Sequence, residues 1–405
     1  MQIARGLGLT FLQRIILLVG VLGSLSPDRA SDASMLLAPA VGAADNATNG
    51  SVVALPTTPE SAMFTNPAGL IAFDRTTHSA SLGAVFPSAE VDSDLAGYNR
   101  SDDRVAFVPS AGSSVPLGPR WRFGIGAYGS TGTTFDFEAE PPGVNSDFLS
   151  DVAIGGMPIA LAYELSPRVW IGAELVPLFG YLRNRYALPD PISGGAIPVE
   201  YTLRGPGIQA MLGATWLPTD RWSLGLSVRT PGMIWLDGST PILGERRDVD
   251  LELRMPTVVW GGVTRHFGER FDLSASVRWT DASVFGESKI EFASFAIPFV
   301  PDAKDEWRFA LGAEYDATDA FTLRAGASYA SRIVGNKGVS PLLFDTEDIK
   351  LSGGLGYRIG AWTIDFLAGY ALEGKRHVSP DDALILPGTY EASGPIVMLG
   401  ATLAL

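Results

Sequence analysis

The chain of 405 residues contains no cysteine, which excludes disulfide bonds, a thiolate nucleophile and a cysteine-ligated metal. Charged residues are scarce, at 18% of the chain against about 25% in ordinary soluble proteins. Basic residues are the scarcer sign, and the net charge of -14 argues against nucleic acid as a partner, because lysine and arginine supply affinity for phosphates. Hydrophobic residues reach 46%, so the composition excludes disorder and favours a membrane protein.

A long apolar run is also missing. A membrane-spanning helix needs about 20 consecutive apolar residues, and beyond residue 45 charges, prolines or paired glycines interrupt every apolar stretch within about a dozen positions. A helical membrane protein is therefore excluded. The β-barrel is the other fold that satisfies all its backbone hydrogen bonds inside lipid, so we expect an all-β transmembrane barrel.

The first 44 residues are predicted to be a signal peptide. Arg5 and Arg14 precede an apolar core, residues 15–22, that breaks off soon afterwards. This length suits the apolar region of an export signal and is too short for the alternative, a membrane anchor. Small residues offer cleavage positions between Ala30 and Ala44, and the sequence leaves the position open.

The remainder of the chain repeats an alternation of apolar and polar residues. Between Phe271 and Trp279 the odd positions are apolar, while the even positions include Asp272 and Arg278. A period of two predicts β-strands, and the serine, glycine, threonine and arginine of the polar face suit a lumen behind a lipid-facing wall. About fourteen such segments can be counted, an even number as bacterial barrels require: near 77–87, 104–117, 120–130, 157–165, 169–186, 201–217, 221–236, 248–267, 270–286, 305–316, 320–332, 348–359, 361–371 and 394–405.

The connections between these segments alternate in length. After every second segment the connection is tight, as at residues 117–119 and 317–319, whereas the others run from about eleven to about twenty-six residues. Short periplasmic turns alternating with long extracellular loops are typical of outer-membrane barrels. Residues 77–405 are therefore predicted to form a fourteen-stranded barrel.

Residues 45–76 do not fit the strand pattern. They contain three prolines and carry apolar side chains, such as Val53, Met63 and Leu70, that need a place to be buried. The barrel lumen is the available place, so we expect this segment to form an N-terminal hatch that plugs the barrel.

Within the hatch, Thr65-Asn66-Pro67-Ala68-Gly69-Leu70 resembles the hatch motif of the FadL/TodX (OMPP1) family, fourteen-stranded outer-membrane transporters of long-chain fatty acids and other hydrophobic compounds. Further phrases resemble that family: MPIALAYELSPRVWIGAEL, WSLGLSVRTPGMIWLDG, the Met255-Pro256 step before VVWGGVTRHF, DEWRFALGAEYDATDAFTLRAGASYA and LSGGLGYRIGAWTIDFLAGYA. The resemblance covers about residues 45–405. The chain departs from the family in ending on Ala404-Leu405 instead of an aromatic residue.

The resemblance implies passive uptake of hydrophobic small molecules, such as long-chain fatty acids or aromatic hydrocarbons. It implies capture at extracellular loops, transfer to a pocket gated by the hatch, and lateral release beside a kinked third strand. In that strand Gly124, Gly126 and Gly129 would permit a bend, because glycine inside a strand often marks a bulge. The gate residues are then Phe64, Asn66, Pro67, Ala68 and Gly69.

Two further sets of residues are candidates for ligand contact. Apolar loop residues either capture the ligand or pack together to cap the barrel: Phe292, Phe295, Ile297, Phe299, Leu384 and Leu386. Lumen-facing arginines either meet a fatty-acid carboxylate or form ion pairs that hold the hatch to the wall: Arg229, Arg278 and Arg324.

Catalysis has little support in the sequence. His78, His266 and His377 have no spacing suited to a metal or a triad, so we expect no enzyme, no metal site and no cofactor. A barrel hydrolase remains an alternative that needs a serine or aspartate beside His266 or His377 on the outer rim, and a general diffusion porin is disfavoured by the apolar hatch. The expected partners are a hydrophobic ligand, outer-membrane lipid, lipopolysaccharide and the barrel-insertion machinery, with the protein a monomer in a Gram-negative outer membrane.

Overall fold

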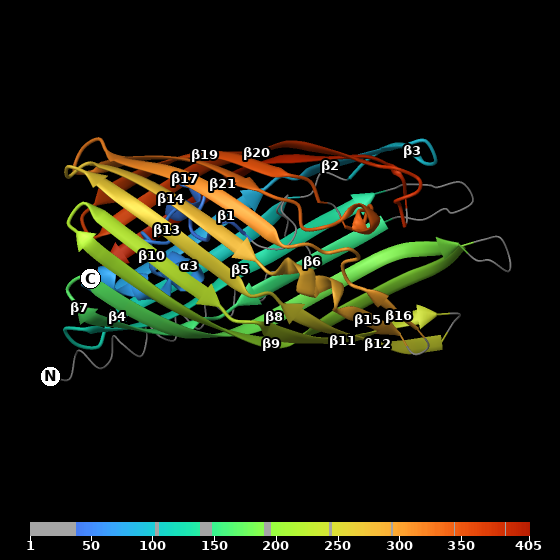
Figure 1. Cartoon of the computed structure of the whole chain (residues 1–405), viewed down its shortest axis with the longest axis horizontal. Coiled ribbons are helices and arrows are strands. Elements are labelled where there is room, and N and C mark those ends of the chain that lie inside the picture. The colour runs from blue at the N-terminus through green and yellow to red at the C-terminus, as the bar shows by residue number, and fades with distance from the viewer. Residues whose placement is uncertain are drawn as a thin grey trace.

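A computed structural model describes residues 38–101, 105–137, 148–189, 196–242, 245–292, 295–343, 345–384 and 386–405. Figure 1 shows a long cylinder of tilted strands with the blue segments that precede the first strand inside it. The predicted signal peptide falls largely on residues 1–37, which lie outside the described residues. No helix in the described ranges is long and apolar enough to cross a membrane.

The wall of the cylinder is a single antiparallel sheet of 21 strand elements, of which 17 make up fourteen barrel strands and four extend the loops. The wall elements are β1 (Thr77–Val85), β4 (Ala106–Pro116), β5 (Trp121–Phe137), β6 (Phe148–Gly156) with β7 (Ile159–Ser166), β8 (Val169–Pro189), β9 (Ala196–Thr219), β10 (Trp222–Arg229) with β11 (Gly232–Ile242), β12 (Glu245–Met255) with β13 (Val258–Phe267), β14 (Phe271–Thr280), β17 (Glu306–Asp316), β18 (Phe321–Ala330), β19 (Asp348–Ile359), β20 (Trp362–Val378) and β21 (Gly388–Ala404). Short elements extend the loops: β2 (Ser88–Ser93), β3 (Gly97–Arg100), β15 (Lys289–Phe292), β16 (Phe295–Pro298) and the 3-10 turns η2 (Ala282–Gly286) and η3 (Asn336–Gly338).

The barrel is closed by its first and last strands. Thr77 of β1 pairs with Ala404 of β21 on one edge and with Ser114 of β4 on the other. The tight turns and the C-terminus gather at one end, and the longer loops lie at the opposite end (Figure 1). The predicted fold class, a fourteen-stranded antiparallel barrel with an N-terminal hatch, is confirmed.

Three barrel strands are interrupted at prolines. Pro158, Pro231 and Pro256 fall between β6 and β7, β10 and β11, and β12 and β13, because proline has no N–H to donate to a ladder. The fourth barrel strand includes β6 ahead of Pro158, so it begins at Phe148 and not at the predicted residue 157. The ninth ends at Thr280, and residues 282–286, predicted to be strand, form the turn η2.

The alternation of side chains places apolar residues outside and polar or small residues inside. On β17, Phe309 and Leu311 are exposed on the outer face, whereas Arg308 and Ala310, which alternate with them, are buried. Aromatic rings concentrate at strand ends on the side of the tight turns: Trp121, Trp216, Trp222, Phe267, Tyr315, Phe321, Tyr357 and Trp362. An apolar band bounded by an aromatic girdle is the surface that a lipid bilayer requires.

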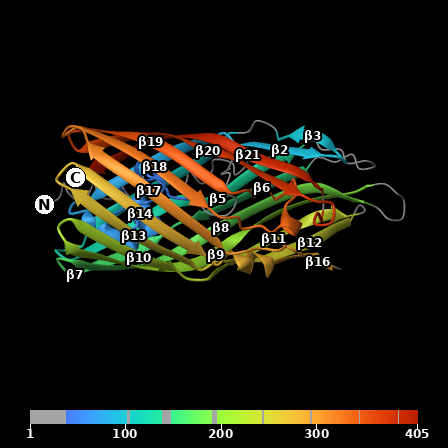
Figure 2. The same cartoon turned by 45° about the horizontal axis from the view of Figure 1, so that its top comes forward.

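The hatch lies inside the barrel. It contains α2 (Ala43–Asn46), α3 (Pro59–Thr65) and the 3-10 helix η1 (Pro67–Ala72), drawn in blue within the cylinder in Figures 1 and 2. Every residue of α2 and α3 is buried, and residues 38–42 ahead of α2 are buried too. The hatch of the folded protein therefore includes residues before the predicted boundary at residue 45.

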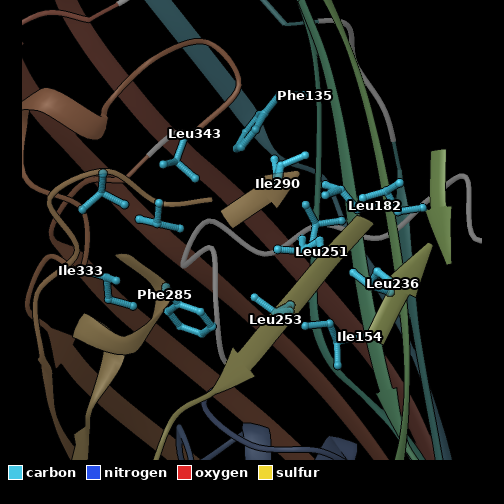
Figure 3. Packing of buried hydrophobic residues seen from close by; sticks show 14 of the residues in the cluster. Phe135, Ile154, Leu182, Leu236, Leu251, Leu253, Phe285, Ile290, Ile333 and Leu343 are labelled. Carbon is cyan, nitrogen blue, oxygen red and sulfur yellow. The ribbon is translucent and has the colours of Figure 1, made fainter. Parts of the chain in front are cut away.

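Above the hatch, towards the long loops, apolar side chains fill the lumen. Strand residues from β5, β6, β8 and β12 meet loop residues such as Phe285 and Ile333 in one buried cluster, part of which Figure 3 shows. The same cluster reaches down to Phe64 in the hatch. The described residues thus leave an apolar interior where a diffusion porin would have a wet channel.

Candidate ligand path and hatch

Asn66 joins three parts of the molecule. Its Nδ2 donates to the Val53 carbonyl at 2.9 Å, to the Ala214 carbonyl at 3.1 Å and to Thr215 Oγ1 at 3.0 Å. Its Oδ1 accepts from the backbone N–H of Ala68 at 3.2 Å, which caps the start of η1. The side chain therefore fixes the hatch motif both to an earlier hatch segment and to strand β9 of the wall.

Glycines in the wall let this motif approach closely. A Cβ on Gly213 would lie 2.1 Å from Asn66 Oδ1, and a Cβ on Gly172 would lie 2.5 Å from the Ala68 nitrogen. Gly69 makes the same allowance inside the hatch, where a Cβ would meet the Pro56 ring at 2.6 Å. The predicted gate residues are thus in direct contact with the wall.

Arg229, on the lumen side of β10, lies against the hatch. Its guanidinium carbon is 5.0 Å from the Phe64 ring centroid and 5.1 Å from that of Trp260, within cation–π range. Its Nη2 donates to the Phe64 carbonyl at 2.7 Å. A cavity of about 10 Å³ adjoins this arginine and is lined also by Tyr128 and Leu178. Arg229 therefore connects a small lumen cavity directly to the hatch.

The wall is incomplete between the second and third barrel strands. The ladder between β4 and β5 ends at Ser110 and Tyr128, while β5 continues to Phe137 paired with β6. The β5–β6 register shifts between Gly129 and Thr131, which is a bulge. At this point Ala38 of the hatch donates its N–H to the Ser130 carbonyl at 2.9 Å.

The other two glycines predicted to bend this strand lie elsewhere. Gly124 and Gly126 belong to the paired half of β5, where added Cβ atoms would come within 2.7 Å of Leu70 and Met63, respectively. They make room for hatch side chains, and only Gly129 adjoins the bulge.

Two of the three predicted arginines form buried ion pairs. Arg278 Nη2 is 2.8 Å from Glu306 Oε2, while its Nη1 donates to the Ala38 carbonyl at 2.9 Å. Arg324 contacts Asp365 at 2.6 Å and Glu314 at 2.5 Å. Arg278 thus matches the alternative in which an arginine holds hatch and wall together, whereas the ion pairs of Arg324 join wall strands β17, β18 and β20.

Most of the predicted capture residues point inward. Phe292 and Leu386 belong to the buried cluster, and Ile297 and Phe299 pack against it. Leu384 is 64% exposed, and Phe295 begins β16. The burial of Phe292 and Leu386 and the partial burial of Ile297 and Phe299 favour their alternative role, packing of the loops over the lumen.

The structure brings one histidine into a network that the sequence could not reveal. Ser223 Oγ lies 3.2 Å from His266 Nε2, and His266 Nδ1 lies 2.7 Å from Asp272 Oδ1. The three side chains come from neighbouring strands at the end with the tight turns. A serine does lie beside His266, whereas His377 contacts Thr389.

Sequence reasoning also missed two carboxyl groups buried in the hatch. Glu60 Oε2 accepts from Ser79 Oγ, and Asp45 accepts from the hydroxyl and the N–H of Thr57. Burial raises the pKa of Glu60 to about 8 and that of Asp45 to about 6, with the Asp45 charge adding to the Glu60 shift. The sequence did contain a signal for these two groups, because Asp45 and Glu60 are acidic residues in a largely apolar segment that was expected to be buried. No group of three or more metal-ligating residues occurs in the described part of the chain.

The same architecture occurs in solved structures. A FadL homologue from Pseudomonas aeruginosa has 19% identity and a TM-score of 0.80, with 92% of this chain and 100% of that chain covered. The toluene transporter TodX of P. putida has 17% identity and a TM-score of 0.76, covering 91% and 99%, and the toluene transporter TbuX of Ralstonia pickettii has 19% identity and a TM-score of 0.72, covering 91% and 99%. None of the curated proteins matches the chain by sequence.

The closed barrel, its aromatic girdle and its internal hatch define an outer-membrane transport protein. A family model described as outer membrane protein transport protein (OMPP1/FadL/TodX) matches residues 205–403. The C-terminal half of the chain thus matches the OMPP1/FadL/TodX family, in agreement with the resemblance in the hatch motif.

Proposed function

We propose that this protein carries hydrophobic small molecules passively across the outer membrane. The observation that carries the proposal is the apolar cluster that fills the lumen from the extracellular loops down to Phe64 of the hatch. An alkyl or aromatic ligand gains about 0.8 kcal/mol for each methylene that it buries, so it can travel through such contacts. Both long-chain fatty acids and aromatic hydrocarbons fit this description, and toluene, the cargo named for TodX and TbuX, is one such hydrocarbon.

The ligand path that we infer passes the cavity beside Arg229, which has room for about one water and must widen to admit a ligand, and leaves through the wall. Arg229 holds the Phe64 carbonyl, so movement of the hatch would change the cavity. The bulge at Gly129 and the end of the β4–β5 ladder lie next to Tyr128, which lines that same cavity. These features support lateral release beside β5, with Asn66, Pro67 and Ala68 as the gate.

Other features of the protein remain proposals. The burial of residues 38–42 in the lumen supports signal-peptide cleavage at one of the earlier positions, Ala30 or Ala33. We also propose a monomer, with contacts to lipopolysaccharide on the outer leaflet and delivery by the barrel-insertion machinery.

The function is tested by mass spectrometry of lipophilic molecules extracted from the purified protein. We expect an enriched hydrophobic ligand, and the variant Leu178→Gln should retain about tenfold less of it, because a buried leucine contributes about 1.5–3 kcal/mol. Leu178 lines the cavity and is 6% exposed. Leu95→Gln, on the exposed β2–β3 hairpin, is the matched control. Equal retention by both variants would place the ligand elsewhere, and passage of hydrophilic sugars without a bound lipophile would support a porin.

The Ser223, His266 and Asp272 network favours one second candidate, a barrel hydrolase. The distances suit a nucleophile, a base and an orienting carboxylate. Ser223 is however only 2% exposed, so a substrate carbonyl has no approach to its hydroxyl in this arrangement. We therefore propose that the network links β10, β13 and β14 without catalysis.

A fluorophosphonate probe separates these two interpretations. We expect no covalent adduct on Ser223, and uptake by Ser223→Ala should equal that of the parent protein. An adduct that disappears in Ser223→Ala, together with ester hydrolysis, would establish the hydrolase.

A further inference from the structure

Arg265 occupies an unusual place for a charged residue. It lies on the lipid-facing side of β13, two residues before the strand ends at Phe267, and its side chain is exposed. Its partners across the two neighbouring strands are Trp222 and Leu273, both exposed apolar residues. The guanidinium thus emerges from the aromatic girdle near the end of the barrel with the tight turns.

Two aromatic rings hold the guanidinium in position. Its central carbon is 4.9 Å from the Trp222 ring centroid and 4.7 Å from that of Phe267. Contacts with two rings limit the freedom of a long side chain, so the cation is presented in a restricted orientation. The Trp222 ring belongs to β10, so the arrangement depends on two strands being paired.

The charge of Arg265 has no acidic counterpart in the described part of the chain. Two arginines at the same end, Arg168 and Arg270, differ in this respect, since Arg168 lies 3.5 Å from Asp220 and Arg270 lies 3.7 Å from Asp319. On the lipid face an arginine is tolerated near the interface, where headgroups are within reach, and is costly deeper in the bilayer. The planar guanidinium offers paired N–H donors that match phosphate oxygens.

We propose that Arg265, Trp222 and Phe267 form a binding site for the phosphate of a glycerophospholipid in the periplasmic leaflet of the outer membrane. The guanidinium donates to the phosphate, while the acyl chains lie along the apolar face that begins with Leu273. The aromatic rings set the height of the cation at the headgroup level. This site is independent of the ligand path, because it faces away from the lumen.

Native mass spectrometry of the full-length protein, stripped of lipid and titrated with phosphatidylglycerol, tests the site. We expect Arg265→Gln to retain about tenfold less phosphatidylglycerol than the parent, the loss of a charge-assisted hydrogen bond. Arg168→Gln removes an arginine that is paired with a carboxylate at the same end, and it should leave retention unchanged. Arg265→Lys keeps the charge without the planar donors and should lie between the parent and Arg265→Gln.

Diacylglycerol, which has the acyl chains and no phosphate, distinguishes headgroup recognition from nonspecific hydrophobic binding of the acyl chains. We expect the parent protein and Arg265→Gln to retain it equally poorly. Phe267→Leu and Trp222→Leu should each lower phosphatidylglycerol retention while leaving the arginine in place. Equal phosphatidylglycerol retention by the parent, Arg265→Gln and Arg265→Lys would overturn the proposal, as would tight diacylglycerol binding at the same level.

Discussion

Replacing Asn66 with alanine is expected to detach the hatch motif from the barrel wall and slow ligand uptake, while the barrel itself stays folded. The substitution leaves the carbonyls of Val53 and Ala214 without their side-chain donor and removes the cap on η1. Each buried polar group left unpaired costs about 1–3 kcal/mol, so the equilibrium constant for docking of the hatch should fall by about tenfold or more. The barrel ladders do not involve this side chain, and their stability should be unchanged.

Uptake of a fluorescent fatty acid and the heat-dependent gel mobility of the barrel measure the two parts of this expectation. Asn66→Asp is an informative companion, because it keeps the oxygen that accepts from Ala68 and loses the donors to Val53 and Ala214. Asn99→Ala provides the matched control, since Asn99 bonds only within its exposed hairpin. Normal uptake by Asn66→Ala would remove Asn66 from the gate, and an unfolded barrel would show that the hatch is needed for folding.

The barrel could be predicted from the sequence because its physical causes are local. A two-residue period places Phe309 and Leu311 outside and Arg308 inside whatever the neighbouring strands are. Tight turns and long loops alternate along the chain because successive connections of an antiparallel barrel lie on opposite sides of the membrane. The strand ends were less predictable, because extracellular extensions such as the last part of β20, residues 372–378, depend on pairing with β21.

The site could be predicted only in part, because its contacts join distant segments. Asn66 could be singled out by its motif, yet its wall partners Ala214 and Thr215 lie nearly 150 positions away. The bulge near Gly129 arises where β5 leaves β4, which no property of the β5 sequence alone specifies. The role of the loop phenylalanines depends on their burial, which the sequence does not reveal. Phe292 is an apolar loop residue in the sequence whether it faces solvent or, as in the structure, is buried.

Raising the pH towards 8 is expected to loosen the hatch, because Glu60 is buried there as a neutral acid. Burial raises the pKa of Glu60 from 4.5 to about 8, with the negative charges of Asp45 and Asp365 adding to the effect and Thr58 opposing it. The docked hatch therefore keeps a proton that an undocked, hydrated Glu60 releases. Docking is strongest below pH 4.5, weakens as the pH rises, and reaches its lowest value above pH 8. A difference of one in pKa corresponds to about 1.4 kcal/mol, so the free energy of hatch docking changes by several kcal/mol over this pH range.

Asp45 contributes in a lower window, which lets the two groups be separated. Burial raises its pKa from 3.8 to about 6, against the hydrogen bonds from Ser61 and Thr57 and the charge of Arg324, so its effect is complete near pH 6. The change between pH 6 and pH 8 then belongs to Glu60. Glu60→Gln preserves the size and the neutral state of the buried group, and the pH dependence of docking in this window should vanish in that variant.

The lack of native cysteine makes the measurement direct. Ala62, which is fully buried in α3, is replaced by cysteine, and its rate of reaction with a thiol reagent reports how often the hatch opens. The rate measured with Glu60 present is divided by the rate measured in the Glu60→Gln variant, which cancels the pH dependence of the reagent itself. That ratio should rise by about tenfold or more from pH 6 to above pH 8, since each 1.4 kcal/mol is a factor of ten. Glu291→Gln, at an exposed position of β15, should give a flat ratio, and an equally flat ratio for Glu60→Gln would mean that the hatch opens without regard to the charge of this carboxyl group.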